Sequence, residues 1–309
     1  MRAEQLSIQQ YRDGIVAGST VMLGRGITLV ESQLESDQQQ AEELLQSLLP
    51  LTGKSIRLAI SGVPGVGKST FIEAFGKYLT SQHHKVAVLA IDPSSSKTYG
   101  SILGDKTRME ELSKDPSAFV RPTATAGHLG GVAGKTRETI LLCEAAGYDI
   151  IIVETVGVGQ SEIAVGSMVD FVLLLMLAGA GDELQGIKKG IIEIADAIAI
   201  NKADGDNIQN ARRAQAELSH ALHLISSSAK VVTCSGLTKT GLDEIWKIIV
   251  AFKEHGAWVE NRKKQQEAWL RESLNELFLR AAKKINHNFS ESSGFPPTMA
   301  RQLFKELTR

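Results

Sequence analysis

The sequence has few of the features that mark disulfide-rich, nucleic-acid-binding or membrane-spanning proteins. Only two of its 309 residues are cysteines, Cys143 and Cys234, which excludes a disulfide framework and a four-cysteine zinc site. Aromatic residues make up 5% and the net charge is -1, so neither a base-stacking platform nor a basic field for nucleic acid is expected. The longest uncharged apolar run, Phe171–Gly181, is well short of the ~20 residues that span a bilayer.

No secretion signal is expected from Met1–Gln10, because this segment is polar and has no apolar stretch. We therefore expect a cytoplasmic protein with no membrane or nucleic-acid partner. Hydrophobic residues make up 43% and charged residues 22%, which is ordinary for a globular protein. At about 150 residues per domain, the length indicates two domains or one large α/β domain with additions.

Three zones follow one another along the chain. Residues 1–54 have a helical pattern, in which the apolar positions of Ala41–Leu49 lie on one face. Residues 55–250 alternate short apolar runs with helical segments. Residues 251–309 are charged and helical, and Lys263–Ile285 is typical of one long amphipathic helix.

The middle zone predicts a doubly wound, mostly parallel sheet, that is, an α/β fold. Most of its apolar runs are continuous rather than alternating, which is typical of strands covered on both faces. Repeated strand–helix units imply parallel pairing. The six predicted strands are Ser55–Ser61, Lys85–Ile91, Ile150–Glu154, Asp170–Met176, Ala197–Asn201 and Lys230–Cys234, and helices are expected at Ser69–Ser81, Lys135–Ala146 and Ile187–Ala195.

A phosphate-binding loop follows the first of these strands. The segment Gly62-Val63-Pro64-Gly65-Val66-Gly67-Lys68-Ser69-Thr70 matches G-x-x-x-x-G-K-[ST], with a strand before it and a helix after it. Glycines let backbone N–H groups converge on phosphate oxygens, and the helix N-terminus adds partial positive charge. Lys68 can reach the outer phosphates and Ser69 can ligate Mg²⁺. The alternative is a glycine turn without a ligand.

A second motif predicts guanine rather than adenine as the base. Asn201-Lys202-Ala203-Asp204 is N-K-x-D at the end of a strand, where ligands of doubly wound sheets bind. The Asp204 carboxylate can accept from guanine N1–H and from the exocyclic amine, which adenine lacks at that position. After the next strand, Ser235, Gly236 and Leu237 stand where GTPases carry their last guanine loop, although that loop normally has alanine in place of Gly236.

Carboxylates near strand ends are candidate Mg²⁺ ligands. Asp92 and Glu154 end predicted strands, and Asp105 lies in the loop between them. Mg²⁺ takes oxygen ligands and retains waters, so one or two carboxylates suffice; caps of helices or turns are the alternative role. In Glu154-x-x-Gly157 the next residue is Val158 rather than a water-orienting glutamine, so slow intrinsic hydrolysis is expected.

These stretches together resemble a known family. The phosphate loop, 91–95, 101–109, 153–162 and the glycine-rich 181–190 closely resemble the MeaB/ArgK group of metallochaperone-type P-loop GTPases, over about residues 10–285. The segment Ser226–Ala229 and the chain after Asn286 depart from the family pattern. The resemblance implies a central G domain (55–250), an N-terminal helical extension (1–54) and a C-terminal dimerisation arm (251–309).

The resemblance also implies a role for the chain. Members are homodimers that hydrolyse GTP and act as chaperones of adenosylcobalamin-dependent methylmalonyl-CoA mutase, gating cofactor loading and protecting the enzyme. On this basis Lys68 and Ser69 contact phosphate and Mg²⁺, the carboxylates of Asp92, Asp105 and Glu154 serve the metal and the attacking water, and 94–108, 154–162 and 177–188 are switches. An ordinary strand–helix connection is the alternative for the third switch.

Three other functions fit the sequence less well. A nucleotide-dependent kinase linked to arginine/ornithine transport, an older label for the group, would need an acceptor pocket. A nickel-delivering GTPase needs a tract rich in His or Cys, whereas the seven histidines here are scattered apart from His83-His84. A purely structural role fits poorly with an intact phosphate loop.

Overall fold

The computed structural model describes residues 6–92, 109–124, 129–155, 161–179 and 189–285, with the backbone alone given at 91–92, 122–124, 129–134, 161–163, 189–190 and 280–285. The chain forms two compact units, Met1–Trp258 and Val259–Arg309. The second unit is described as far as Ile285 and there consists of most of α13 (Ala257–Ile285).

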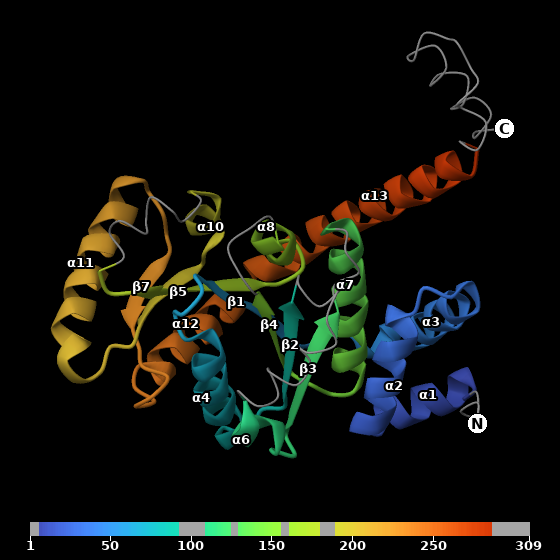
Figure 1. Cartoon of the computed structure of the whole chain (residues 1–309), viewed down its shortest axis with the longest axis horizontal. Helices are drawn as coiled ribbons and strands as arrows, with labels where there is room; N and C mark the ends of the chain where they lie inside the picture. The colour runs from blue at the N-terminus through green and yellow to red at the C-terminus, as the bar shows by residue number, and fades with distance from the viewer. Residues whose placement is uncertain (1–5, 93–108, 125–128, 156–160, 180–188, 286–309) are drawn as a thin grey trace, which may run out of the picture. The chain divides into compact units, whose positions relative to one another are not determined.

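The first unit is built on a seven-stranded parallel sheet (Figure 1). Its strands are β1 (Ile56–Gly62), β2 (Val86–Asp92), β3 (Ala118–Ala124), β4 (Ile150–Thr155), β5 (Phe171–Leu177), β6 (Ala197–Asn201) and β7 (Lys230–Thr233). Their order is β3-β2-β4-β1-β5-β6-β7, and every pairing is parallel. The predicted doubly wound α/β fold is therefore confirmed.

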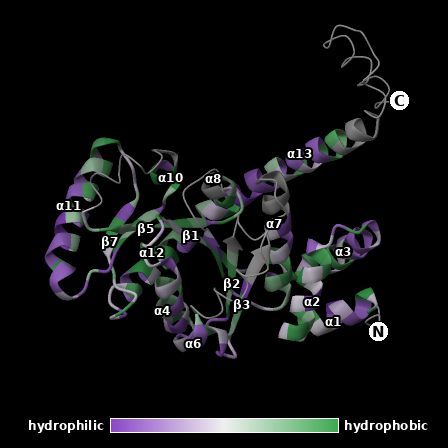
Figure 2. Ribbon diagram, viewed as in Figure 1, coloured by the Kyte–Doolittle hydropathy of each residue, from purple (hydrophilic) through white to green (hydrophobic). Residues whose placement is uncertain are grey.

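Successive residues of each central strand face two different helical layers. Leu58 and Ile60 of β1 pack with α4 (Lys68–Ser81), α6 (Glu110–Ser113) and α12 (Leu242–Glu254) in one core. Ala59 faces the opposite layer, which contains α7 (Leu129–Ala145) and α8 (Ser161–Gly166). Beyond β5, that layer continues with α10 (Lys189–Ile194) and α11 (Ile208–Leu224), and Figure 2 shows hydrophilic residues over the outer surface of α11. Burial on both faces explains the continuous apolar runs.

The edge strand β3 was not predicted from the sequence. It contains Arg121 and Pro122, which interrupt the apolar run that marked the other strands. Proline cannot donate to a strand ladder and is confined mainly to edge strands, and β3 pairs only with β2 among the described strands. Helix α7 also begins at Leu129 rather than at the expected Lys135.

The N-terminal helices share a core with the sheet. Helices α1 (Ile8–Val16), α2 (Thr20–Glu31) and α3 (Glu35–Leu48), followed by the 3-10 turn η1 (Leu49–Leu51), contribute Ile15, Leu23, Ile27 and Leu44, each fully buried, to the layer that contains α7. Figure 1 shows these helices beside α7. Arg121 of β3 adds polar contacts, donating to Glu31 at 2.8 Å and to the Gly24 carbonyl at 3.2 Å.

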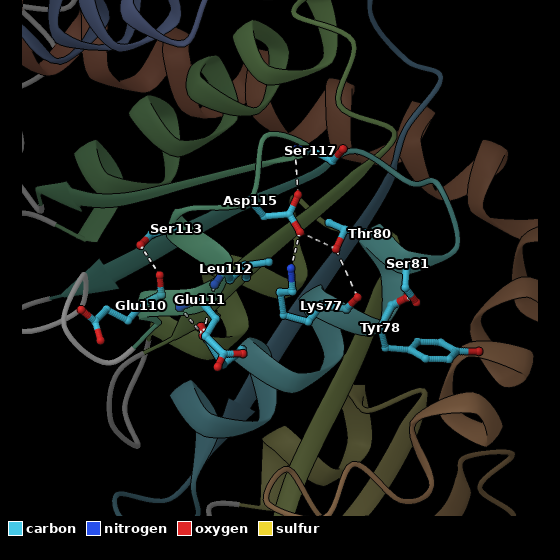
Figure 3. A network of polar contacts seen from close by, with 11 residues as sticks. Lys77, Tyr78, Thr80, Ser81, Glu110, Glu111, Leu112, Ser113, Asp115 and Ser117 are labelled. Atoms are coloured by element: carbon cyan, nitrogen blue, oxygen red, sulfur yellow. Dashed lines mark hydrogen bonds and ion pairs between the residues drawn. The ribbon is translucent and has the colours of Figure 1, made fainter.

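One face of α4 anchors α6 and the turn that leads into β3. Glu73 accepts from the backbone N–H groups of Glu111 and Leu112 at 2.7 and 3.1 Å. Further along α4, Lys77 and Thr80 both donate to the Asp115 carboxylate, at 2.6 and 2.8 Å (Figure 3). Because α4 begins at the phosphate loop, these contacts connect that loop to the turn before β3.

Helix α13 carries several exposed apolar side chains. Leu270, Leu274, Leu277 and Phe278 are between 45% and 63% exposed. No helix in the described part of the chain is both long and apolar enough to cross a membrane.

Candidate functional site

The phosphate loop leaves the central strand β1 and enters α4. At Gly62, where φ is 154°, a Cβ would lie 2.6 Å from the carbonyl oxygen of Leu175, so a larger residue has no room there. Lys68 begins α4, and its Nζ donates to the carbonyls of Gly62 and Val63 at 2.7 and 3.2 Å. The ammonium group therefore lies over the loop that is predicted to hold the phosphates.

Two of the predicted metal ligands lie together at the start of α4. The Ser69 hydroxyl donates to Glu154 Oε1 at 3.3 Å, and Glu154 is buried near the end of β4. A hydroxyl and a carboxylate are hard oxygen donors of the kind that Mg²⁺ accepts. No group of three or more His, Cys, Asp or Glu side chains with metal-site geometry occurs in the described part of the chain.

Asn201 joins the predicted base-recognition loop to the phosphate loop. Its side-chain amide donates to the Val66 carbonyl at 2.9 Å, and its Oδ1 accepts from the Gly236 N–H at 3.3 Å and from the Cys234 thiol at 3.6 Å. Asn201 is 2% exposed, so these contacts replace water. Burial raises the pKa of the Cys234 thiol to about 12, which keeps the sulfur protonated as a donor.

The last two loops are held together at Asp204 and Ser235. Ser235 Oγ donates to the Asp204 carboxylate and accepts from the N–H groups of Leu237 and Thr238 at 3.2 and 3.1 Å. Lys202, with φ of 57°, extends its Nζ to the Gly65 carbonyl at 2.9 Å. The lysine stem therefore extends from the N-K-x-D loop to the phosphate loop.

Gly236, which replaces the usual alanine, packs against the backbone of α4. A Cβ at this position would lie 3.0 Å from both N and Cα of Phe71, which is tighter than most such contacts. The glycine therefore allows a close approach of the last loop to the phosphate-loop helix.

The structure thus brings together most of the predicted site residues at the carboxyl ends of β1, β4, β6 and β7. Asp92 ends β2, but its side chain is not described. Asp105 and the whole first predicted switch, 94–108, lie outside the described residues, as does most of the other two switches. Two residues of this edge were missed, Ser61 and Thr155, whose hydroxyls bond at 2.9 Å. Each is the only hydroxyl residue in its strand, and this is the signal that could have found them.

The parallel sheet, the phosphate loop and the adjoining N-K-x-D loop define a P-loop GTPase. Residues 23–287 match the family described as "Methylmalonyl Co-A mutase-associated GTPase MeaB". The chain therefore belongs to the MeaB family and is a GTPase.

Individual relatives agree with this family. The chain is 50% identical over 286 residues to "GTPase ArgK" of Escherichia coli, covering 88% of this chain and 85% of the relative. It is 46% identical over 295 residues to "Methylmalonic aciduria type A homolog, mitochondrial" of Mus musculus, covering 89% and 71%. A solved "LAO/AO transport system kinase" matches all of both chains at 36% identity and a TM-score of 0.76.

Proposed function

We propose that the chain is a GTP-hydrolysing chaperone that associates with adenosylcobalamin-dependent methylmalonyl-CoA mutase, gates loading of its cofactor and protects it. The observation that carries this proposal is the family match over 23–287, whose description names that association. The Mus musculus relative, named for methylmalonic aciduria, supports the same client.

In this proposal the phosphate loop and its neighbours bind and position GTP. Lys68 leaves the Gly62 and Val63 carbonyls to contact the outer phosphates. Ser69 and Glu154, with Asp92 and Asp105, are the residues that would hold Mg²⁺. When bound there, Mg²⁺ would supply positive charge that offsets the negative charge developing on the phosphates during hydrolysis. The glutamine that orients water in Ras-like proteins is absent after Gly157, which favours slow hydrolysis until a partner binds.

The base is recognised by the loops that follow β6 and β7. Asp204 would accept two hydrogen bonds from guanine, and Ser235 holds that carboxylate in place. Asn201 fixes this loop to the phosphate loop, and the Lys202 stem would cover the base. The backbone of Gly236 and Leu237 completes the expected base site.

The partner is tested with purified components. Methylmalonyl-CoA mutase is titrated onto the immobilised protein with GDP, with a non-hydrolysable GTP analogue and without nucleotide. We expect saturable binding whose affinity differs between the two nucleotides. Lys68→Ala should lose the difference between nucleotide states, and the absence of binding in every state would contradict the proposal.

A second copy of the chain is the proposed partner of α13. Its exposed leucines recur on one stripe, since Leu270, Leu274 and Leu277 are 63%, 45% and 62% exposed. Apolar patches of this kind on a protein surface mark association sites. Leu270→Glu combined with Leu277→Glu should convert a dimer into a monomer in light-scattering measurements, whereas Glu272→Gln should leave the dimer intact. A monomeric parent protein would contradict this assignment.

A kinase linked to arginine/ornithine transport is the second candidate. It is favoured by the solved "LAO/AO transport system kinase", which matches the whole chain. The two functions differ in where the γ-phosphoryl group of GTP goes. Labelled GTP should release inorganic phosphate in the GTPase reaction, and transfer of label to a basic-amino-acid-binding protein would support the kinase.

A further inference from the structure

The tips of β1 and β4 are joined by two buried hydroxyl groups. Thr155 Oγ1 donates to Ser61 Oγ at 2.9 Å, and the two residues are 1% and 2% exposed. In the parallel pairing of these strands, Ile60 lies opposite Glu154. The hydroxyl pair is therefore one residue beyond this pair, at the edge of the sheet where the nucleotide is expected.

The two residues adjoin the two parts of the proposed metal site. Ser61 directly precedes Gly62, the first residue of the phosphate loop, and Thr155 directly follows Glu154. The loop and the carboxylate also meet directly, because Ser69 donates to Glu154 Oε1 at 3.3 Å. The hydroxyl pair thus links the backbone that leads to Ser69 with the backbone that carries Glu154.

Stability alone does not account for hydroxyl groups in this position. Burying a hydroxyl is unfavourable unless it is hydrogen-bonded. An apolar pair of the same shape is often nearly neutral for stability, whereas removal of one partner leaves the other unsatisfied and is costly. What the hydroxyl pair adds is a directional bond that fixes the relative position of the two strand tips.

We propose that Ser61 and Thr155 are positioning residues for GTP hydrolysis, which act by setting the distance between the phosphate loop and the Glu154 carboxylate. This inference rests on the proposed role of Ser69 and Glu154 in holding Mg²⁺. Both side chains are buried, so they would act through Glu154 and the phosphate loop rather than by touching the nucleotide.

Four variants test the proposal: Thr155→Val, Thr155→Ser, Ser61→Ala and the double variant Ser61→Ala/Thr155→Val. For each we would measure the unfolding midpoint, the Mg²⁺ concentration that half-maximally slows release of a fluorescent GDP, and kcat and KM for GTP. Thr155→Val should destabilise the protein, require more Mg²⁺ and lower kcat by about tenfold or more, because a misplacement of about 1 Å can cost about a hundredfold in rate. KM should change less than kcat.

The other variants separate positioning from stability. Thr155→Ser retains the hydroxyl and should restore the Mg²⁺ requirement and kcat. The double variant should regain much of the stability but neither the Mg²⁺ response nor kcat. Thr139→Val is the matched control, since Thr139 is also fully buried and donates within α7 to the Lys135 carbonyl at 2.8 Å; it should lower stability without affecting GDP release or kcat.

Two results overturn the proposal in distinguishable ways. If Thr155→Val and the double variant keep the parent Mg²⁺ response and kcat while Glu154→Gln loses them, the metal assignment stands and the positioning role is wrong. If Glu154→Gln also keeps the parent Mg²⁺ response, the metal assignment on which the inference rests is wrong.

Discussion

Asn201 donates its side-chain amide to the carbonyl oxygen of Val66 at 2.9 Å, so a residue at the end of β6 holds the backbone of the phosphate loop. The same side chain accepts from the Gly236 N–H. One buried amide therefore links the loops that are expected to contact the phosphates and the base.

Asn201→Ala should weaken binding of GDP and GTP together. The substitution leaves the Val66 carbonyl and the Gly236 N–H without a partner in a buried site, which also costs about 1–3 kcal/mol of stability. Binding of a fluorescent GDP and denaturant unfolding would measure the two effects. Asn210→Ala, at an exposed position of α11, is the control and should change neither. Unchanged GDP affinity in Asn201→Ala would contradict the linking role.

Asp204→Asn should change which nucleotide is bound. An amide at this position presents a donor where guanine also has donors, whereas the base of XTP has a carbonyl that can accept. Competition among GTP, XTP and ATP should show weaker GTP binding and relatively better XTP binding. Asp206→Asn, two residues further along in an exposed position, should keep the parent order. If Asp204→Asn also keeps the parent order of GTP, XTP and ATP affinities, the Asp204 carboxylate does not select the base.

Asp196→Asn should stabilise the protein above pH 6. Burial raises the pKa of Asp196 to about 6, although the Val172 N–H, which donates to it at 2.8 Å, opposes the shift. Since the folded-state pKa lies above the ordinary value of 3.8, the favourable contribution of this group is complete below pH 3.8 and is lost as the pH rises through 6. Asparagine cannot ionise, so the variant avoids this loss of folding stability, which is about 1–3 kcal/mol.

Denaturant unfolding at pH 4, 6 and 8 measures the effect of Asp196→Asn. The difference from the parent protein should be largest at pH 8 and nearly absent at pH 4. Glu193→Gln, at a nearby exposed position, should show no such trend. A variant that is less stable than the parent at pH 8 would mean that the ionised carboxylate is favourable in the fold.

The ion pair between Arg57 and Glu144 should make the protein sensitive to acid. Burial pushes the pKa of Glu144 up, but hydrogen bonds from Arg57, Ser55 and Gly53 outweigh it and hold the pKa below 4.5. A lowered pKa means that this stabilisation is present above pH 4.5 and is lost as the pH falls through the folded-state value.

Removing one partner of this pair is expected to be costly. Arg57→Met leaves a carboxylate that is only 1% exposed without its cation, at a cost of about 3–5 kcal/mol at pH 7. Arg57→Met with Glu144→Leu should cost less, because no charge remains buried. Unfolding measurements at pH 7 would compare the two variants, and an equal loss in both would argue against a buried-charge penalty.

The sequence predicted the parts of the fold that follow from continuous apolar runs. Six strands were predicted within one or two residues, and Ala197–Asn201 matches β6 as observed. Strand β3 was missed because Arg121 and Pro122 disrupt its pattern, and its place at the sheet edge became clear only from pairing with β2. The glycines at the start of α7 similarly hid the first turns of that helix.

The parts of the site that consist of a local sequence motif could be predicted. The parts that depend on contacts between distant residues could not. The phosphate loop and N-K-x-D were read directly from local sequence. The contacts of Glu144 with residues 53–57, and of Ser61 with Thr155, join residues far apart in sequence that have no motif. The reason for glycine at 236, its approach to Phe71, likewise requires the folded chain.

The most direct test of the central claim is the steady-state rate of GTP hydrolysis with and without purified adenosylcobalamin-dependent methylmalonyl-CoA mutase. We predict slow hydrolysis by the protein alone and a saturable increase when the mutase is added, which Lys68→Ala abolishes. A rate that does not respond to saturating mutase, in a preparation that binds GTP, would contradict the proposal that this GTPase serves the mutase.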